Sequence, residues 1–141
     1  MKRILLVLFA FSAFLANAQN WGSNDADSIR CFENYNNFGQ LCNGKDYLQD
    51  VDDALAMVPL SAHVDLVIYN AGMDPHERCS TGGAAGITTE VLRKREEMVF
   101  KWAREHGYPV SFALAGGYSG GRLSREELVD LHRMTIQAAT L

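Results

Sequence analysis

From residue 45 onward the chain alternates between apolar, β-prone runs and segments with helical spacing. The two β-prone runs are residues 64–69 (VDLVIY) and residues 108–115 (YPVSFALA). Both are short and largely apolar at consecutive positions, which is typical of strands buried on both faces of a sheet. Helical segments precede, separate and follow them. This order of helix, strand, helix, strand and helix predicts an α/β fold with a parallel sheet and right-handed connections.

Capping and breaking residues mark the ends of the first two expected helices. Apolar residues recur at helical spacing over residues 47–58, and Pro59 ends that segment. Thr88 or Thr89 can cap a second helix, which Gly107 ends. The inward side of this second helix is expected to comprise Val91, Leu92, Met98, Val99, Trp102 and Ala103.

The last expected helix has a two-residue start signal. Ser124 and Glu127 have the spacing of a capping box, in which each side chain accepts a hydrogen bond from the backbone N–H of the other. We expect this helix to pack against the sheet. Its inward side is expected to comprise Leu128, Leu131, Thr135 and Ala138.

The first eighteen residues have the order of parts found in export signals. Lys2 and Arg3 form a positive head, and residues 4–15 form an uncharged apolar run. Residues 16–18 (ANA) place small side chains where a signal peptidase cleaves. We therefore expect residues 1–18 to be a signal peptide and the product to be exported, either to a periplasm or out of the cell. The alternative is a buried N-terminal strand or helix of the domain, in a cytoplasmic protein.

The remaining residues divide into a polar segment and one domain. Residues 19–44 are rich in asparagine and show no sustained period, so we expect mostly irregular structure with one short strand near residues 29–32. Residues 45–141 carry the alternating pattern and form one α/β domain. The length of 141 residues allows a single domain.

Charge and cysteine content limit the classes of partner. The formal net charge of −4 gives no cationic surface for nucleic acid or an anionic membrane. Three cysteines, Cys31, Cys42 and Cys79, cannot all pair within one chain. A disulfide between the first two would leave Cys79 free, but the sequence does not decide this. No C-x-x-C pair is present, so a zinc site built on cysteine is not expected.

A polar turn follows each of the two predicted strands. Residues 70–77 (NAGMDPHE) carry Asp74 in front of Pro75, and residues 116–121 (GGYSGG) carry Tyr118 between glycines. The carboxyl ends of parallel strands share one edge of a sheet, and ligands gather there. A carboxylate on a stiff turn suits a divalent cation, and a phenol can donate to a carbonyl oxygen as negative charge builds on it. The simpler interpretation makes these segments a turn and a loop.

In their order, these segments resemble the C-terminal part of the histone deacetylase family, most closely its bacterial acetyl-lysine and acetylpolyamine deacetylase-like members. The resemblance covers about residues 45–139 and rests on two separated motifs around a helix. It implies a three-layer α/β/α fold and hydrolysis of acetyl-lysine, or of another acetylated small molecule, by zinc-bound water. It also implies that Asp74 is the last zinc-binding aspartate and Tyr118 the transition-state tyrosine. Gly116 and Gly117 would then form a substrate rim.

The chain departs from the family pattern in the other half of the site. Family members also bind zinc through an earlier Asp-x-His pair and activate water with a tandem His-His. Residues 74–76 spell Asp-x-His but occupy the place of the later aspartate, so His76 is not assigned the missing role. The four histidines include no tandem pair: His63, His76, His106 and His132. Because catalytic zinc needs three protein ligands, we expect no useful turnover from this polypeptide alone, and a complementing partner or a homo-oligomer is an open possibility.

Three further alternatives stay open. The Gly-rich residues 78–86 either shape a substrate rim or form a flexible loop. The whole chain is alternatively a non-catalytic exported domain that binds a ligand or a partner. Asn-Ala-Gly after a strand also occurs in short-chain dehydrogenases, but these have a glycine-rich turn and a Tyr-x-x-x-Lys, whereas Tyr118 is followed at that spacing by Arg122.

Overall fold

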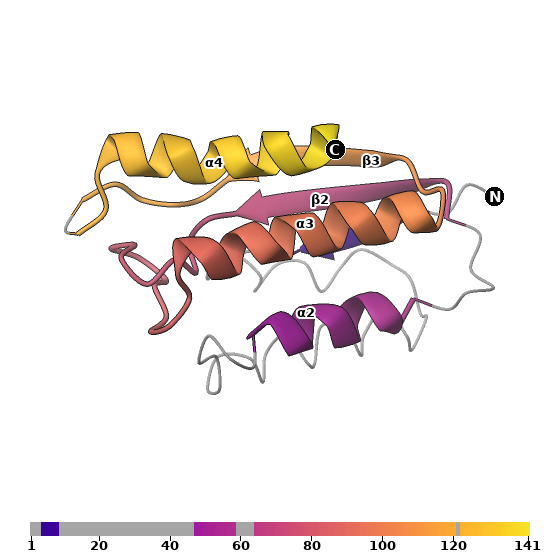
Figure 1. Cartoon of the computed structure of the whole chain (residues 1–141), viewed down its shortest axis with the longest axis horizontal. Helices are drawn as coiled ribbons and strands as arrows, with labels where there is room; N and C mark the ends of the chain where they lie inside the picture. Colours follow the sequence, from indigo (N-terminus) through magenta and orange to yellow (C-terminus); the bar gives the residue numbers. More distant parts are fainter. Residues whose placement is uncertain (1–3, 9–46, 59–63, 121) are drawn as a thin grey trace, which may run out of the picture.

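The computed structural model describes residues 4–8, 47–58, 64–120 and 122–141. These residues form, in chain order, β1 (Ile4–Leu8), α2 (Tyr47–Ala56), β2 (Leu66–Gly72), α3 (Thr89–Glu105), β3 (Val110–Ala115) and α4 (Arg125–Thr140). The strands make one parallel sheet in the order β1-β2-β3 (Figure 1). The predicted α/β class with a parallel sheet is confirmed.

The described helices gather on one face of the sheet. Val67, Tyr69 and Ala71 alternate along β2 and are completely buried on that face. Phe100 of α3 meets Tyr69 edge-on, with ring centroids 5.7 Å apart, and meets Phe112 of β3 at 5.4 Å. Helices α2 and α4 each pack against α3, which lies between them (Figure 1). The described residues place no helix on the opposite face, so the third layer of the expected fold stays a prediction.

Both strands begin two residues later than their local sequence predicts, and β2 also ends later. The second strand was expected over residues 64–69, but β2 runs to Gly72 because Asn70, Ala71 and Gly72 pair with β3. The third was expected from residue 108 but begins at Val110. Cross-strand pairing decides these ends, and a single run of residues does not show its partner. The extension matters because it brings the sheet to within two residues of Asp74.

The helix ends follow the predicted signals. Thr88 is the N-cap of α3, and its side chain accepts a hydrogen bond from the N–H of Val91 at 3.3 Å. Gly107 follows the C-cap of α3 with φ +68°, a left-handed conformation that favours glycine. Ser124 and Glu127 form the predicted capping box at the start of α4. These local signals are confirmed because each is satisfied within a few residues of chain.

The inward faces of the helices are only partly as predicted. Leu92, Val99 and Ala103 are buried on α3, whereas Val91, Met98 and Trp102 are half-buried. On α4, Leu131, Thr135 and Ala138 are buried as expected, and Leu128 is half-buried. The buried residues that the apolar pattern missed are Arg95, Glu96 and Phe100 on α3 and Met134 on α4. Two of these four are charged, which excludes them from any search for apolar periodicity.

The N-terminal apolar run forms a strand in this structure. Ile4–Leu8 pairs with β2 in parallel, from Ile4 opposite Leu66 to Leu8 opposite Asn70. This is the alternative that the sequence left open beside a signal peptide, and removal of residues 1–18 stays a prediction. Residues 19–44, with the expected short strand and the first two cysteines, lie outside the described residues. Among the described helices, none is long and apolar enough to cross a membrane.

Deleting residues 1–18 tests whether β1 belongs to the folded domain. We expect the shortened chain to lose several kcal/mol of unfolding free energy, at about 1 kcal/mol for each lost ladder hydrogen bond, because β2 becomes an open edge. Urea unfolding of both chains measures this. Leu6→Pro in the full chain is the control, since it breaks strand pairing without changing length. Equal unfolding midpoints for all three proteins would show that β1 contributes nothing to the fold.

Candidate functional site

The Asp74 carboxylate lies directly against the glycine turn that follows β3. Asp74 is 2% exposed, and its Oδ1 accepts a hydrogen bond from the N–H of Gly117 at 3.2 Å. One residue earlier, the N–H of Met73 donates to the carbonyl oxygen of Ala115 at 3.0 Å, which joins the two strand ends. The two polar turns therefore meet at the carboxyl edge of the sheet, as their positions after parallel strands predict. The catalytic and metal-binding roles assigned to them stay predictions.

Close packing explains why glycines stand in this turn. Gly116 and Gly117 have φ of +58° and +75°. A Cβ on Gly116 would lie 1.7 Å from Oδ2 of Asp74, and one on Gly117 would lie 2.4 Å from Cδ1 of Leu128. Neither position has room for a side chain. The turn thus needs glycine for its own packing, whether or not a substrate approaches it.

A buried thiol holds the backbone of Tyr118, whereas the aromatic ring of Tyr118 is exposed to solvent. The N–H of Tyr118 donates to Sγ of Cys79 at 3.2 Å. Cys79 is a buried, free thiol, as one of the cysteine alternatives requires. Tyr118 as a whole is 49% exposed, so the described residues do not enclose its side chain in a cleft. Asp74 and Tyr118 thus lie on two adjoining turns, but Asp74 is buried and Tyr118 is half-exposed to solvent.

His76 has a structural position inside the loop. It is buried, its Nδ1 accepts a hydrogen bond from the N–H of Arg78 at 3.3 Å, and its Nε2 lies 3.1 Å from Oγ1 of Thr89. Because Nδ1 accepts, Nε2 carries the proton and donates to Thr89. Burial lowers the pKa of His76 and favours this neutral form. Both ring nitrogens are engaged, which agrees with leaving His76 out of the ligand set.

The Gly-rich loop closes back onto the strand end. The N–H of Ala84 donates to the carbonyl oxygen of Pro75 at 3.1 Å, and the N–H of Glu77 donates to that of Ile87 at 2.8 Å. A Cβ on Gly83 would lie 2.7 Å from the carbonyl oxygen of Cys79, so this glycine also permits a close backbone approach. These bonds fold the loop back onto the residues that follow Asp74, and Cys79 of the same loop contacts Tyr118.

A fully buried ion pair lies beneath this edge of the sheet. Nε of Arg95 donates to Oε1 of Glu96 at 2.8 Å, and both side chains are 0% exposed. Oε1 of Glu96 also accepts a hydrogen bond from the phenol of Tyr69 at 2.7 Å. This pair was not predicted from the sequence. A usable signal was present, because Arg95 and Glu96 stand three and four residues after the inward-facing Leu92.

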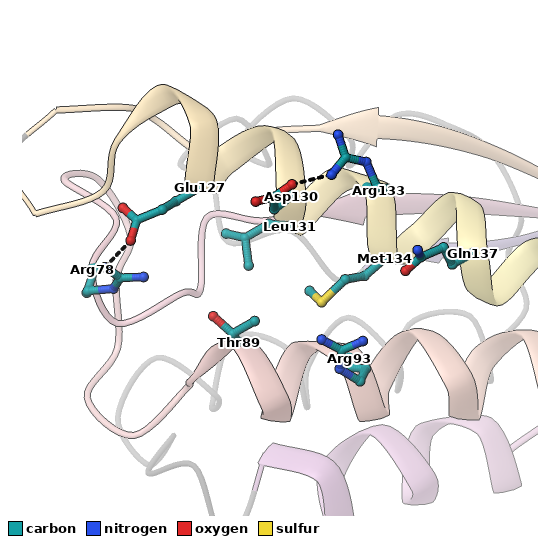
Figure 2. Close-up of a pocket in the computed structure, with 9 residues that line it drawn as sticks. All are labelled: Arg78, Thr89, Arg93, Glu127, Asp130, Leu131, Arg133, Met134 and Gln137. Atoms are coloured by element: carbon teal, nitrogen blue, oxygen red, sulfur yellow. Dashed lines mark hydrogen bonds and ion pairs between the residues drawn. The ribbon is translucent and has the colours of Figure 1, made fainter.

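A groove of about 450 Å³ runs between α3 and α4 (Figure 2). Its charged side chains pair locally: Arg78 binds Glu127 at 2.6 Å, and Arg133 binds Asp130. Hydrogen bonds from the Ser124 backbone and from Arg78 lower the pKa of Glu127 below its ordinary value. Neither Asp74 nor Tyr118 lines the groove. These are exposed ion pairs of the kind that contribute little energy, and they indicate a solvated surface between two helices.

The described residues do not by themselves fit a zinc site. They contain no group of three or more histidine, cysteine, aspartate or glutamate side chains that is placed to hold a metal ion. Asp74 offers one carboxylate, and one of its oxygens already accepts from Gly117. A catalytic zinc ion takes three protein ligands and one open position. The expected role of Asp74 as a metal ligand therefore depends on donors outside the described residues.

Three curated proteins are similar to part of this chain, including the following two. Histone deacetylase 2 of Arabidopsis thaliana is 33% identical over 90 residues, which are 62% of this chain and 23% of that protein. An uncharacterized protein from a Picosynechococcus species is 33% identical over 93 residues, which are 66% of this chain and 30% of that protein. No family model matches.

The chain therefore contains a deacetylase-like region, in agreement with the resemblance found in its motifs. The alternative resemblance to short-chain dehydrogenases gains no support from these relatives. The chain spans less than a third of the length of either relative.

Gly116→Ala tests the contact between Asp74 and the glycine turn. We expect it to lower the free energy of unfolding by about 2 kcal/mol or more, because a left-handed backbone and a steric overlap with the carboxylate add together. Gly107→Ala is the matched control, since Gly107 has a similar φ of +68° but nothing within 4 Å of its Cβ position. Denaturant unfolding of both variants measures the difference.

Combining Gly116→Ala with Asp74→Ala separates the overlap from the backbone effect. The double variant should lose less than the sum of the two single losses, because the carboxylate that collides with the new methyl group is gone. Equal losses for Gly116→Ala and Gly107→Ala would contradict the contact.

Proposed function

We propose that this chain supplies the C-terminal part of a zinc-dependent deacetylase site that hydrolyses acetyl-lysine or a related acetyl-amide. The observation that carries the proposal is the hydrogen bond between the Asp74 carboxylate and the N–H of Gly117, one residue before Tyr118. It links the two motifs that the deacetylase resemblance requires. The 33% identity to a histone deacetylase over 90 residues supports the same conclusion independently.

Each residue at this edge has a different chemical role in the proposed site. The half-exposed phenol of Tyr118 is accessible to a ligand and can donate a hydrogen bond to the oxygen of an acetyl carbonyl as negative charge builds on it. Gly116 and Gly117 present backbone without side chains, so a flat amide can approach the turn closely. Asp74 fixes the turn and presents a carboxylate at its base. Zinc enters the proposal through the family resemblance, with Asp74 as one of its ligands.

The proposal is for a divided site. The 141-residue sequence contains no His-His pair, and its two Asp-x-His triplets, at residues 74–76 and 130–132, do not stand in the earlier strand where the family places that pair. The remaining ligands and the general base must therefore come from another part of a longer protein, from a partner or from a second copy. A general base typically contributes ~10²- to 10⁴-fold to such a step. The polypeptide alone should accordingly be inactive.

Incubating the purified 141-residue chain with zinc and an acetylated lysine peptide tests whether the polypeptide alone is inactive. We expect no release of acetate above the zinc-only background, because one carboxylate does not make a catalytic zinc site. Metal-dependent turnover that disappears in Asp74→Asn would contradict the divided site, since it would show that the chain completes the centre by itself.

Joining the chain to a segment that carries His-His and Asp-x-His tests whether the missing ligands and general base complete the site. In an active product, Tyr118→Phe should lower kcat by about 10²-fold, the usual effect of removing one donor to a developing oxyanion. Asp74→Asn should weaken zinc binding and abolish turnover. Tyr108→Phe and Asp53→Asn, a phenol and a carboxylate away from this edge, are the matched controls.

A non-catalytic exported domain that binds a ligand or a partner is the second candidate. The observation in its favour is β3, an edge strand of the sheet that the described residues form, on which Phe112 and Leu114 are 36% and 46% exposed. An edge strand with exposed apolar side chains is a common place for another chain to bind. Full activity of both Tyr118→Phe and Asp74→Asn in a completed site would favour this candidate over the hydrolase.

A further inference from the structure

Arg95 reaches from the middle of α3 to the carboxyl end of β2. Its Nη1 donates to the carbonyl oxygen of Gly72 at 2.9 Å and to the phenol oxygen of Tyr47, on α2, at 3.0 Å. Its Nη2 lies 3.7 Å from Sδ of Met73, within the range of a weak hydrogen bond to sulfur. One guanidinium thus contacts both residues that precede Asp74, and it ties them to two helices.

This arrangement costs free energy that an apolar core would not. Arg95 and Glu96 are 0% exposed, and buried ion pairs are often no more stabilising than apolar residues of the same volume. In addition, Oε2 of Glu96 is buried and has no hydrogen-bond partner among the described residues. A site that only had to be filled would be better served by leucine or methionine. The charged pair is therefore more consistent with a need for fixed geometry than with a need for stability.

Arg95 and Tyr69 keep their protonated forms in these surroundings. Burial alone would lower the pKa of Arg95, but Tyr47, Tyr69 and Glu96 outweigh it and raise the pKa well above its ordinary value. Burial likewise raises the pKa of Tyr69, so its phenol stays protonated and donates to Glu96. The five donor hydrogens of the guanidinium keep their orientation, because acceptors from β2, α2 and Glu96 surround it.

We infer that Arg95 is a positioning residue for Asp74: it fixes the strand end at Gly72 and Met73 so that the carboxylate meets the glycine turn. A role of Arg95 in catalysis rests on the proposed function, whereas its effect on the position of the Asp74 carboxylate does not. Glu96 and Tyr69 act one step further away, by orienting the guanidinium. Lysine cannot replace Arg95, because one ammonium group does not reach Gly72, Tyr47 and Glu96 with the same planar geometry.

The N–H of Gly117 reports the placement of Asp74 directly, since Asp74 accepts its hydrogen bond. In Arg95→Met and Arg95→Lys, we expect the Gly117 amide resonance to shift and its hydrogen exchange to accelerate by about tenfold. Leu55→Ala, a cavity variant in α2, supplies a loss of stability remote from the strand end. Tyr47→Phe removes one acceptor of Nη1 but leaves the bond to Gly72, so the Gly117 amide should change less than in the Arg95 variants. Glu96→Gln keeps the shape of the Arg95–Glu96 pair, and its Gly117 amide is measured instead if the Arg95 variants do not fold.

An unchanged Gly117 amide in folded Arg95 variants, or an equal change in Leu55→Ala, would overturn the inference. So would an unchanged amide in Glu96→Gln, should the Arg95 variants fail to fold. The measurement needs neither metal nor turnover, so its result is separate from the fate of the proposed function. If Arg95→Met moves the amide while Asp74→Asn leaves a completed site fully active, the placement stands and the deacetylase proposal fails.

Discussion

The contact between the Asp74 carboxylate and the turn at Gly116 and Gly117 is the constraint on which this edge of the sheet depends. Parallel pairing of β2 with β3 brings the two strand ends together, but it does not decide what fills the space between the turns that follow them. The carboxylate does so by accepting from a backbone N–H at a point where a Cβ would collide with it. An acid at 74 and glycines at 116 and 117 are therefore one feature, although 41 residues separate their sequences.

The same contact limits what the site can do without other parts. One oxygen of Asp74 is committed to the turn, and the described residues supply no second and third ligand for a metal ion. Tyr118 remains accessible, with its backbone held by Cys79 and its ring half-exposed. This edge of the sheet thus combines a buried carboxylate in a fixed position, Asp74, with a solvent-accessible phenol, Tyr118. A deacetylase-like activity would require a second surface that carries histidines to meet it.

Much of this fold could be predicted from the sequence because its signals are local. Thr88, Gly107 and Ser124 mark helix ends through bonds to their own neighbours, and two apolar runs are enough to predict a parallel sheet. The edge itself was predictable because strand ends converge in such sheets. Arg95 and Glu96 were missed because their partners, Gly72 and Tyr69, lie more than twenty residues away and charged side chains do not contribute to apolar periodicity. The full length of β2 was missed for a similar reason, since pairing with Ala113 and Ala115 extends it.

The most direct test of this account is the scalar coupling across the hydrogen bond from the N–H of Gly117 to the carboxylate carbon of Asp74, measured by NMR on isotope-labelled protein. The account predicts a measurable coupling in the native chain that disappears in Asp74→Ala, together with slow exchange of the Gly117 amide. A Gly117 amide that shows no coupling and exchanges as freely as an exposed loop would contradict it, because acid and glycine turn would then not be joined.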